Sequence, residues 1–328
     1  PPPTFFSTHT PPNAISGCLV GSEMCIRDRD WIAGFPNNPL IEAVAKEGIR
    51  PIMFRQERGG IMAADGYSRT MMGKKFGVFA CQGGPGAENS YGGIAQAFAD
   101  SVPIMFIPDG IPLINSDVSP SFISSKNFTD ITKWSKSIND SNRIVPLMKR
   151  AFHSLKNGRP SPVLIEMHRD HMTQEVSNFK QYNSPHQSKF FPTDYFIDSS
   201  VKLLVESENP IIWSGQGVLY SSATDELKEL SSLLSLPVIT TMPGKSSFDE
   251  RNPLSLGSAN RTAPKTVWKY LGISDTVFAI GSSLTITNYG ILCNKLESIS
   301  LLALVVTLNS GCLLYTSPSP RDRQKSRM

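Results

Sequence analysis

The chain has 328 residues with a formal net charge of +4, and it contains five cysteines. No uninterrupted apolar run is long enough to span a bilayer, which excludes a membrane-spanning helix. The cysteines form neither a metal-ligand pattern nor a disulfide framework, so a reducing cytoplasm is the expected location.

The two ends of the chain are related through the genetic code. One allowed back-translation of "CLLYTSPSPRD" (312–322) has a reverse complement that, entered two bases in, reads "LVGSEMCIRD" (19–28). This relation resembles a sequencing-library adapter translated from both strands, so we expect 1–29 and 312–328 to be non-native, adapter-like tails. Without them the net charge falls to +1, because 312–328 carries a net +3 and 1–29 carries none. The basicity therefore gives no reason to expect a nucleic-acid or membrane partner.

From residue 30 to 172, short apolar runs alternate with longer amphipathic ones. Strands are predicted at 30–35, 49–54, 76–81, 102–108 and 162–167, and helices at 38–48, 59–72, 90–100 and 145–158. Strands of continuous apolar character between helices are typical of a parallel sheet that is covered on both faces.

A polar segment rich in Asn, Gln, Ser and Pro follows, and we predict that 173–195 is a linker. The alternation then restarts over 196–311. Helices are predicted at 201–207, 223–235 and 264–272, and strands at 210–215, 237–242, 276–281 and, as a buried strand, 301–306. The expected fold class is α/β, with two doubly wound, mainly parallel-sheet domains.

Glu57 comes directly after the second predicted strand, at the edge where open parallel sheets bind their ligands. Gly59 and Gly60 open the next predicted helix, although glycine in a helix interior costs roughly 1 kcal/mol relative to alanine. That cost indicates that something bulky approaches closely. From position alone, however, an exposed carboxylate paired with Arg55 or Arg58 is the commoner arrangement.

The turn "QGGPGAEN", from Gln82 to Asn89, also stands between a predicted strand and a predicted helix. Glycines in such a turn let backbone N–H groups meet a ligand at a helix N-terminus. The turn lacks the Lys-Ser/Thr of a phosphate-binding loop and has Asn89 where the dinucleotide fingerprint needs glycine. Alone, it is also compatible with a tight structural turn.

Several ordered motifs together resemble a known family. "GFPNN" (34–38), "RQERGGIMAADGYSR" (55–69), "GGPGAEN" (83–89) and "AFADSVPIMFIP" (97–108) resemble the pyrimidine-binding domain of thiamine diphosphate enzymes of the acetolactate synthase type. "GRPSPVLIEMHRD" (158–170) resembles the segment that closes that domain, and "PVITTMPGKSSFDERNPLSLG" (237–257) resembles the central domain. The resemblance implies a pyrimidine-binding domain over 30–172 and a central α/β domain over 196–311.

The resemblance also implies roles for single residues. The family's acid matching Glu57 hydrogen-bonds the cofactor's aminopyrimidine at N1′, which promotes deprotonation of the thiazolium carbon that attacks a 2-oxo acid. Small residues such as Gly59 and Gly60 would let the ring approach. By position, Pro36 is implied to line the pyrimidine pocket, and Gln82 and Asn89 to lie at the ring's edge or at a subunit contact. Turn geometry is an equal alternative for each of these three.

The sequence departs from the acetolactate synthase pattern at three places. Gln56 replaces a histidine before the catalytic acid, and Asp109-Gly110-Ile111 replaces a glutamine after the fourth predicted strand. The stretch 282–285 replaces the acidic, Arg-containing stretch of flavin-binding members, which argues against FAD. "SGQGVLY" (214–220) carries only part of a dinucleotide fingerprint and is predicted to be a βα turn.

Members of the family carry a third domain whose Gly-Asp-Gly and downstream Asn hold Mg²⁺ and the cofactor's diphosphate. No Gly-Asp-Gly occurs in the 328 residues. We therefore expect the Mg²⁺ ligands to lie in a missing C-terminal domain, this chain to supply no metal ligand, and the chain alone to be inactive. The full-length protein is expected to be a homodimer or homotetramer, because the family's cofactor lies between subunits.

The leading hypothesis is a fragment of a thiamine diphosphate-dependent lyase or transferase that forms or cleaves a C–C bond next to the carbonyl of a 2-oxo acid. One alternative is a decarboxylase of 2-oxo acids or acyl-CoA in the same superfamily, and another is a non-catalytic α/β module. A nicotinamide-dependent oxidoreductase is less well supported, because it needs a complete glycine fingerprint and an acid at the end of the next strand.

Overall fold

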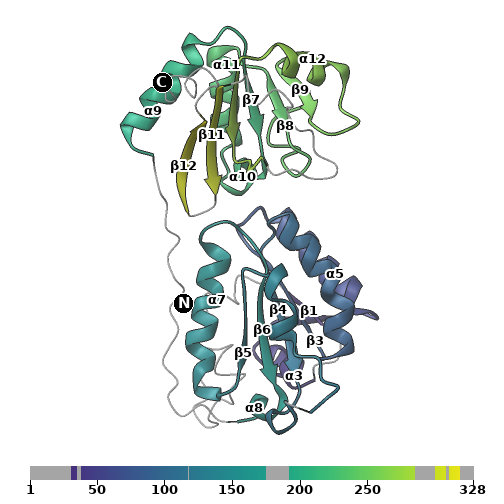
Figure 1. The fold of residues 1–328 in the computed structure, drawn as a ribbon. Helices are drawn as coiled ribbons and strands as arrows, with labels where there is room; N and C mark the ends of the chain where they lie inside the picture. The colour runs from purple at the N-terminus through teal and green to yellow at the C-terminus, as the bar shows by residue number, and fades with distance from the viewer. Residues whose placement is uncertain are drawn as a thin grey trace, which may run out of the picture. The chain divides into compact units, whose positions relative to one another are not determined.

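The computed structural model describes residues 31–34, 38–116, 118–174, 192–284, 300–307 and 310–317. The chain divides into two compact units, Pro1–Gln187 and Ser188–Met328, and each is built on one six-stranded sheet (Figure 1). The division falls within the predicted linker, most of which lies outside the described residues. The predicted α/β class with two mainly parallel-sheet domains is confirmed.

The sheet of the first unit has the strand order β2-β1-β3-β4-β6-β5, and every neighbouring pair is parallel. Its strands are β1 (Trp31–Gly34), β2 (Arg50–Met53), β3 (Gly77–Cys81), β4 (Ile104–Gly110), β5 (Trp134–Ile138) and β6 (Val163–His168). Every residue of β3, β4 and β6 is buried, which explains the mainly apolar character of these strands in the sequence. The edge strand β5 is only partly buried and was not predicted.

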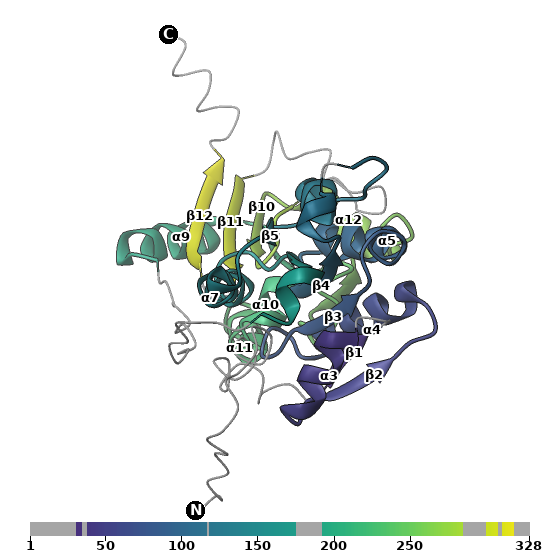
Figure 2. The ribbon, with the colours of Figure 1, turned by 90° about the horizontal axis from the view of Figure 1, so that it is seen from below.

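Helices cover both faces of this sheet (Figures 1 and 2). Leu40 of α3 (Asn38–Lys46) and Phe152 of α7 (Ile144–Lys156) belong to the core on one face. Ile61 of α4 (Glu57–Thr70) and Ile94 of α5 (Pro85–Ala99) belong to the core on the other. Short helical segments complete the unit: η1 (Leu113–Asn115), α6 (Ser124–Asn127), η2 (Thr129–Ile131), η3 (Ser141–Arg143) and α8 (Arg169–Met172).

The order of the strands reverses at β1. The chain passes from β1 to its neighbour β2 and then returns past β1 to β3 on the other side. Gly34 at the end of β1 pairs with Ala80 of β3, so the carboxyl ends of these two strands are adjacent. Open α/β sheets bind ligands outside the carboxyl ends of the strands at such a reversal.

Two glycines let α4 pack closely against its neighbours. A Cβ on Gly60 would lie 2.4 Å from Cε2 of Phe79 on β3, and a Cβ on Gly93 of α5 would lie 2.4 Å from Cγ2 of Ile61. The expectation that Gly60 leaves room for a ligand ring is therefore wrong, because the phenyl ring of Phe79 fills that space. Gly59 is not constrained in this way, since a Cβ there would meet only Cδ1 of Phe54 at 3.7 Å.

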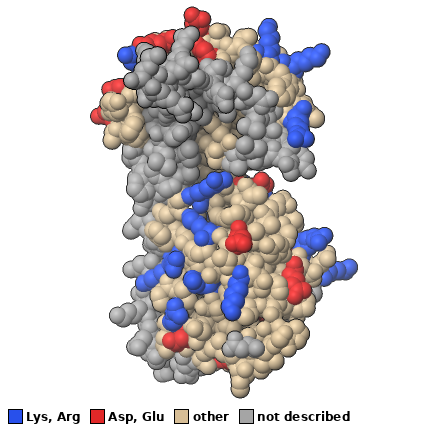
Figure 3. Space-filling model, viewed as in Figure 1, with Lys and Arg blue, Asp and Glu red and all other residues tan. Residues whose placement is uncertain are grey.

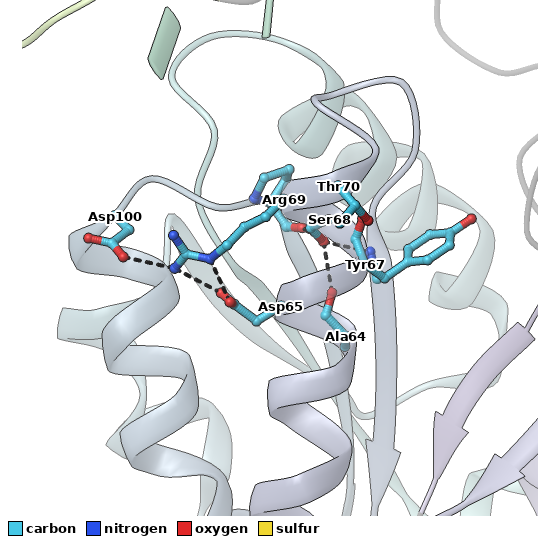
Figure 4. A network of polar contacts seen from close by, with 9 residues as sticks. Ala64, Asp65, Tyr67, Ser68, Arg69, Thr70 and Asp100 are labelled. Carbon is cyan, nitrogen blue, oxygen red and sulfur yellow. Dashed lines mark hydrogen bonds and ion pairs between the residues drawn. The ribbon is translucent and has the colours of Figure 1, made fainter. Parts of the chain in front are cut away.

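Polar contacts fix the C-terminal half of α4 (Figure 4). The buried Ser68 hydroxyl accepts from the Gly77 N–H at 2.7 Å and donates to the Pro103 carbonyl at 2.6 Å. Arg69 Nε donates to Asp65 Oδ2 at 2.6 Å, and its Nη2 donates to Asp100 at 2.8 Å. Burial alone would lower the pKa of Arg69, but the bonds to the two carboxylates raise it on balance. The helix is thus attached both to the amino edge of the sheet and to the end of α5.

The sheet of the second unit has the order β12-β11-β10-β7-β8-β9. Its strands are β7 (Pro210–Ser214), β8 (Val238–Thr240), β9 (Ser255–Ser258), β10 (Thr276–Ile280), β11 (Ser300–Thr307) and β12 (Ser310–Ser317). Leu204 of α9 (Asp194–Glu206) and Leu227 of α11 (Thr224–Leu234) belong to one core, and Val267 of α12 (Lys265–Ile273) belongs to the other. A short helix, α10 (Gln216–Tyr220), follows β7.

The last strand differs from the sequence-based boundary. β12 crosses residue 311 and pairs antiparallel with β11, whereas 312–328 was predicted to be a tail outside the fold. An unpaired strand edge can accept any extended segment that follows it closely, which accounts for the pairing without reference to the origin of the segment. The other neighbouring strands of this sheet pair in parallel.

Charged side chains are mixed on the visible surface. Figure 3 shows Lys and Arg scattered over one face of each unit, with Asp and Glu between them. Within the ranges that the structure describes, no helix combines the length and the apolar character that crossing a membrane requires.

Candidate functional site

Glu57 is the first residue of α4 and only 4% exposed. The helix begins two residues earlier than Gly59, the predicted start, and therefore places this carboxyl in its first turn. The N–H groups of a first turn lack intrahelical partners, and the helix dipole favours negative charge there. Arg55 and Arg58 are exposed, and among the described residues neither forms an ion pair with Glu57. The exposed ion pair considered from position alone is not formed.

Asn89 contacts Glu57 directly. Its Nδ2 donates to Oε2 of Glu57 at 3.1 Å. Asn89 lies on α5, which begins at Pro85 and not at Ser90 as predicted. Proline at the first helical position and Gly84 before it at φ +61 account for this early start, because the proline ring presets the helical φ.

Gly86 lies against the other oxygen of Glu57. A Cβ on Gly86 would lie 3.2 Å from Oε1 of Glu57 and 2.9 Å from Cγ of Gln82. Gly86 is buried and Gln82 is half-buried. The glycine therefore lets the carboxyl and the Gln82 side chain come together at the carboxyl edge of the sheet. Gly86 was not among the predicted site residues, although its place directly after the proline of a helix start was a usable signal.

Cys81 ends β3 beside this group and is fully buried. Burial raises the pKa of its thiol well above the usual range, and the nearby carboxylates of Asp109 and Glu57 act in the same direction. The thiol therefore stays protonated at neutral pH and adds no charge to the site.

A second buried carboxyl lies at the same edge of the sheet. Asp109 on β4 is 4% exposed, and its Oδ2 accepts from Arg169 Nε at 2.7 Å. Burial raises the pKa of Asp109, and the bond from Arg169 partly offsets this. Its Oδ1 has no hydrogen-bond partner among the described residues. A Cβ on Gly83 would lie 2.1 Å from the Asp109 carbonyl, so the glycine-rich turn abuts the end of β4. The sequence indicated Asp109 only as a departure from a family pattern.

The structure thus brings three of the four predicted site residues together. Glu57 and Gln82 lie against Gly86 at the reversal of strand order, and Asn89 donates to Glu57, whereas Pro36 lies outside the described residues. The group fits the edge of an aminopyrimidine ring, because a carboxyl oxygen and an amide offer acceptor and donor positions beside a residue without a side chain. Within the described ranges no cluster of three His, Cys, Asp or Glu could hold a metal ion.

The glycine-containing turn after β7 is closed by its own hydrogen bonds. The Gly215 N–H donates to the Ile280 carbonyl at 2.8 Å, and the Gly217 N–H donates to the Gly281 carbonyl at 2.9 Å. A Cβ on Gly215 would lie 2.3 Å from the Gly281 carbonyl oxygen. These N–H groups join the ends of β7 and β10 and do not form an open phosphate cradle, in agreement with the prediction of a structural βα turn.

Comparison with known proteins identifies both units. The family model described as thiamine pyrophosphate enzyme, N-terminal TPP binding domain, matches 31–131, and the model of the central domain matches 197–299. A probable acetolactate synthase large subunit of Methanocaldococcus jannaschii is 32% identical over 262 residues, covering 76% of this chain and 44% of the relative.

Two further relatives have the same description. The acetolactate synthase large subunit of Cyanidium caldarium is 35% identical over 229 residues, which cover 65% of this chain and 37% of that protein. The large subunit of Lactococcus lactis is 30% identical over 267 residues, covering 76% and 45% respectively. The chain spans less than half the length of these relatives. With both its N-terminal and its central domain matched, the chain belongs to the thiamine pyrophosphate enzyme family.

Proposed function

We propose that this chain is the pyrimidine-binding and central part of a thiamine diphosphate enzyme that forms a C–C bond next to the carbonyl of a 2-oxo acid. The buried Glu57, bonded to Asn89 and adjacent to Gly86, is the observation that carries the proposal. The names of the relatives, acetolactate synthase, support the reaction type. When bound, the cofactor supplies the reactive carbon and the electron sink that such chemistry requires.

In this proposal Glu57 is the catalytic acid. Its carboxyl is almost fully shielded from water, and its backbone lies in the first turn of a helix. A carboxyl in that place can hold a proton at the ring nitrogen of an aminopyrimidine and take it back. By their positions in the motifs, Pro36 is proposed to line the pyrimidine pocket, and Gln82 and Asn89 to lie at the edge of the ring or at a subunit contact.

We place the Mg²⁺ site and the contacts to the diphosphate outside the 328 residues, in a further domain of a full-length homodimer or homotetramer. Charge-assisted bonds to phosphate and the metal supply much of the affinity for a diphosphate. The chain alone is therefore expected to be inactive. Calorimetric titration with thiamine diphosphate and Mg²⁺ tests this part, and micromolar binding to the chain alone would contradict it.

The test of the catalytic role is Glu57→Gln in the full-length protein. Glutamine keeps the shape of the side chain and its bond to Asn89 but cannot exchange the proton, so turnover of a 2-oxo acid is expected to fall by at least about 100-fold with the fold intact. Arg58→Gln is the matched control, because Arg58 is the exposed neighbour on the same helical turn. If Glu57→Gln were as active as Arg58→Gln, the proposal would be refuted.

Decarboxylation without ligation is the second candidate. It is favoured by Asp109 and Gly110, which stand where the ligating enzymes of the resembled family have a glutamine. Analysis of the products separates the two reactions. Carbon dioxide with a C–C-linked product supports ligation, whereas carbon dioxide with the shortened aldehyde or acyl product supports decarboxylation.

A further inference from the structure

We propose that Asn89 is a positioning residue that assigns different tasks to the two oxygens of Glu57. Its amide holds Oε2 as a hydrogen-bond acceptor, so that a proton exchanged by the carboxyl is carried on Oε1, beside Gly86. The catalytic meaning of this assignment rests on the proposed function, but the contact and its direction can be tested without it.

The assignment follows from the donor and acceptor capacity of the two groups. The nitrogen of a side-chain amide carries two protons and accepts none, so the Glu57 oxygen at 3.1 Å from Nδ2 must be the acceptor. A proton on Oε2 would make that oxygen a poorer acceptor and weaken this bond. The bond from Asn89 therefore favours Oε1 as the oxygen that carries a proton.

The space beside Oε1 is kept open by a missing side chain. A Cβ on Gly86 would lie 3.2 Å from Oε1, close enough to obstruct a donor or acceptor arriving there. The Cys81 sulfur lies 3.5 Å from the same Cβ position, and its protonated thiol brings no competing charge. Oε1 is thus the oxygen of Glu57 that remains for exchange with a ligand.

The contact joins two rigid elements. Glu57 begins α4 and Asn89 lies on α5, and the two helices pack closely where Gly93 meets Ile61. A hydrogen bond between side chains on packed helices fixes the orientation of a carboxyl more tightly than a contact on a loop. Asn89 therefore sets the rotamer of Glu57, and its own contact to the ring is not required for this task.

Isotope-labelled NMR of the 328-residue chain tests the direction of the bond. With ¹⁵N-asparagine, one Asn89 side-chain proton is expected to be protected from exchange and shifted downfield, and both effects are expected to vanish in Glu57→Leu. Glu57→Gln should keep them, because its carbonyl oxygen can still accept. Two equally exposed Asn89 protons, or a shift that survives Glu57→Leu, would overturn the proposal.

The pH dependence of stability in Asn89→Asp tests whether the side chains of residues 57 and 89 are close to each other. In Asn89→Asp a second carboxyl replaces the donor beside Glu57, and each negative charge disfavours the other, so the folded state binds protons more tightly than the unfolded state. The equilibrium constant for local opening of α4 and α5 should then rise by up to about tenfold per pH unit between roughly pH 5 and 7. In Glu57→Gln/Asn89→Asp the amide donates to the carboxylate, and this dependence should disappear.

Hydrogen exchange measured by mass spectrometry reports both helices separately. Asn115→Asp is the matched control, because Asn115 is exposed on η1. The other titratable groups near the pair are Cys81 on β3 and Asp109 on β4, while Arg55, Arg58 and Glu88 are exposed. Equal exchange rates of α4 and α5 in Asn89→Asp and Asn115→Asp, at both roughly pH 5 and roughly pH 7, would overturn the proposal.

In the full-length enzyme, Asn89→Ser is expected to lower kcat by roughly ten- to 100-fold and to move its pH profile, because the carboxyl is no longer held in place. Asn115→Ser should change neither. An unshifted profile in Asn89→Ser would restrict Asn89 to a structural role and overturn the positioning assignment. Full activity in Glu57→Gln would instead refute the proposed function and leave the NMR result standing.

Discussion

Gly60→Ala is expected to destabilise the first unit, whereas Gly59→Ala, one residue earlier on the same helix, is expected to stabilise it. Neither residue has a left-handed φ, so alanine gains roughly 0.5–1 kcal/mol of helix propensity at both positions. At Gly59 the added Cβ meets only Phe54 at 3.7 Å, and the gain is kept. At Gly60 it would lie 2.4 Å from Phe79 Cε2.

The Phe79 ring cannot move aside easily. It is fully buried, and it stacks on Phe106 with ring centroids 5.9 Å apart. Overpacking of such a core costs typically 1–3 kcal/mol, and a contact this short belongs to the upper half of that range. After subtraction of the propensity gain, a net loss of about 1–2.5 kcal/mol remains for Gly60→Ala.

Urea unfolding followed by circular dichroism measures the two variants, and hydrogen exchange of α4 assigns the effect to the first unit. The midpoint should fall for Gly60→Ala and rise for Gly59→Ala relative to the parent chain. Equal midpoints for the two variants would show that α4 does not lie against Phe79 as described, and close packing would then no longer explain the glycine at position 60.

Three further outcomes are expected. Arg169→Gln leaves the buried Asp109 without its cation. Since a raised pKa means that the folded carboxyl binds its proton more tightly, stability falls as pH rises through that pKa, and urea titrations should show a larger loss for Arg169→Gln at pH 8 than at pH 4.5. Arg69→Met leaves Asp65 buried and unpaired, and thermal unfolding should show a loss of about 1–3 kcal/mol, less than for a fully buried pair because Arg69 is partly exposed. Iodoacetamide at pH 8 should label Cys81 at least about tenfold more slowly in the folded chain than in urea, as peptide mass spectrometry can measure, because burial disfavours the reactive thiolate.

Continuous apolar runs and amphipathic periods predicted the parallel sheets and most of their helices. These patterns are weak where a strand is not buried on both faces. The edge strand β5, "WSKSI", mixes polar and partly buried positions, so it has neither a continuous apolar run nor a strict alternation. The short edge strand β9, "SLGS", is half-buried throughout and was missed for the same reason.

Helix starts were the other source of error. The helix α5 was predicted to begin at Ser90, after a turn over 82–89, but Pro85 already begins it. That displacement of one turn matters for the site, since it places Gly86 and Asn89 on a rigid element. The residues of the candidate site were predictable from motif order, whereas the hydrogen bond between Glu57 and Asn89 depends on helix packing that no single stretch of sequence specifies.

Because α4 is attached to the sheet near its C-terminal end, a change in its tilt there displaces its N-terminal end, where Glu57 lies. The helix has 14 residues, and at 1.5 Å per residue its length is about 20 Å. Ser68 fixes one end to the amino edge of the sheet, and Glu57 stands at the opposite end. A small tilt produced near Ser68 would therefore be magnified at the carboxyl. Under the proposed function, natural variation at that remote hydroxyl would then shift the catalytic carboxyl while every residue around it stays the same.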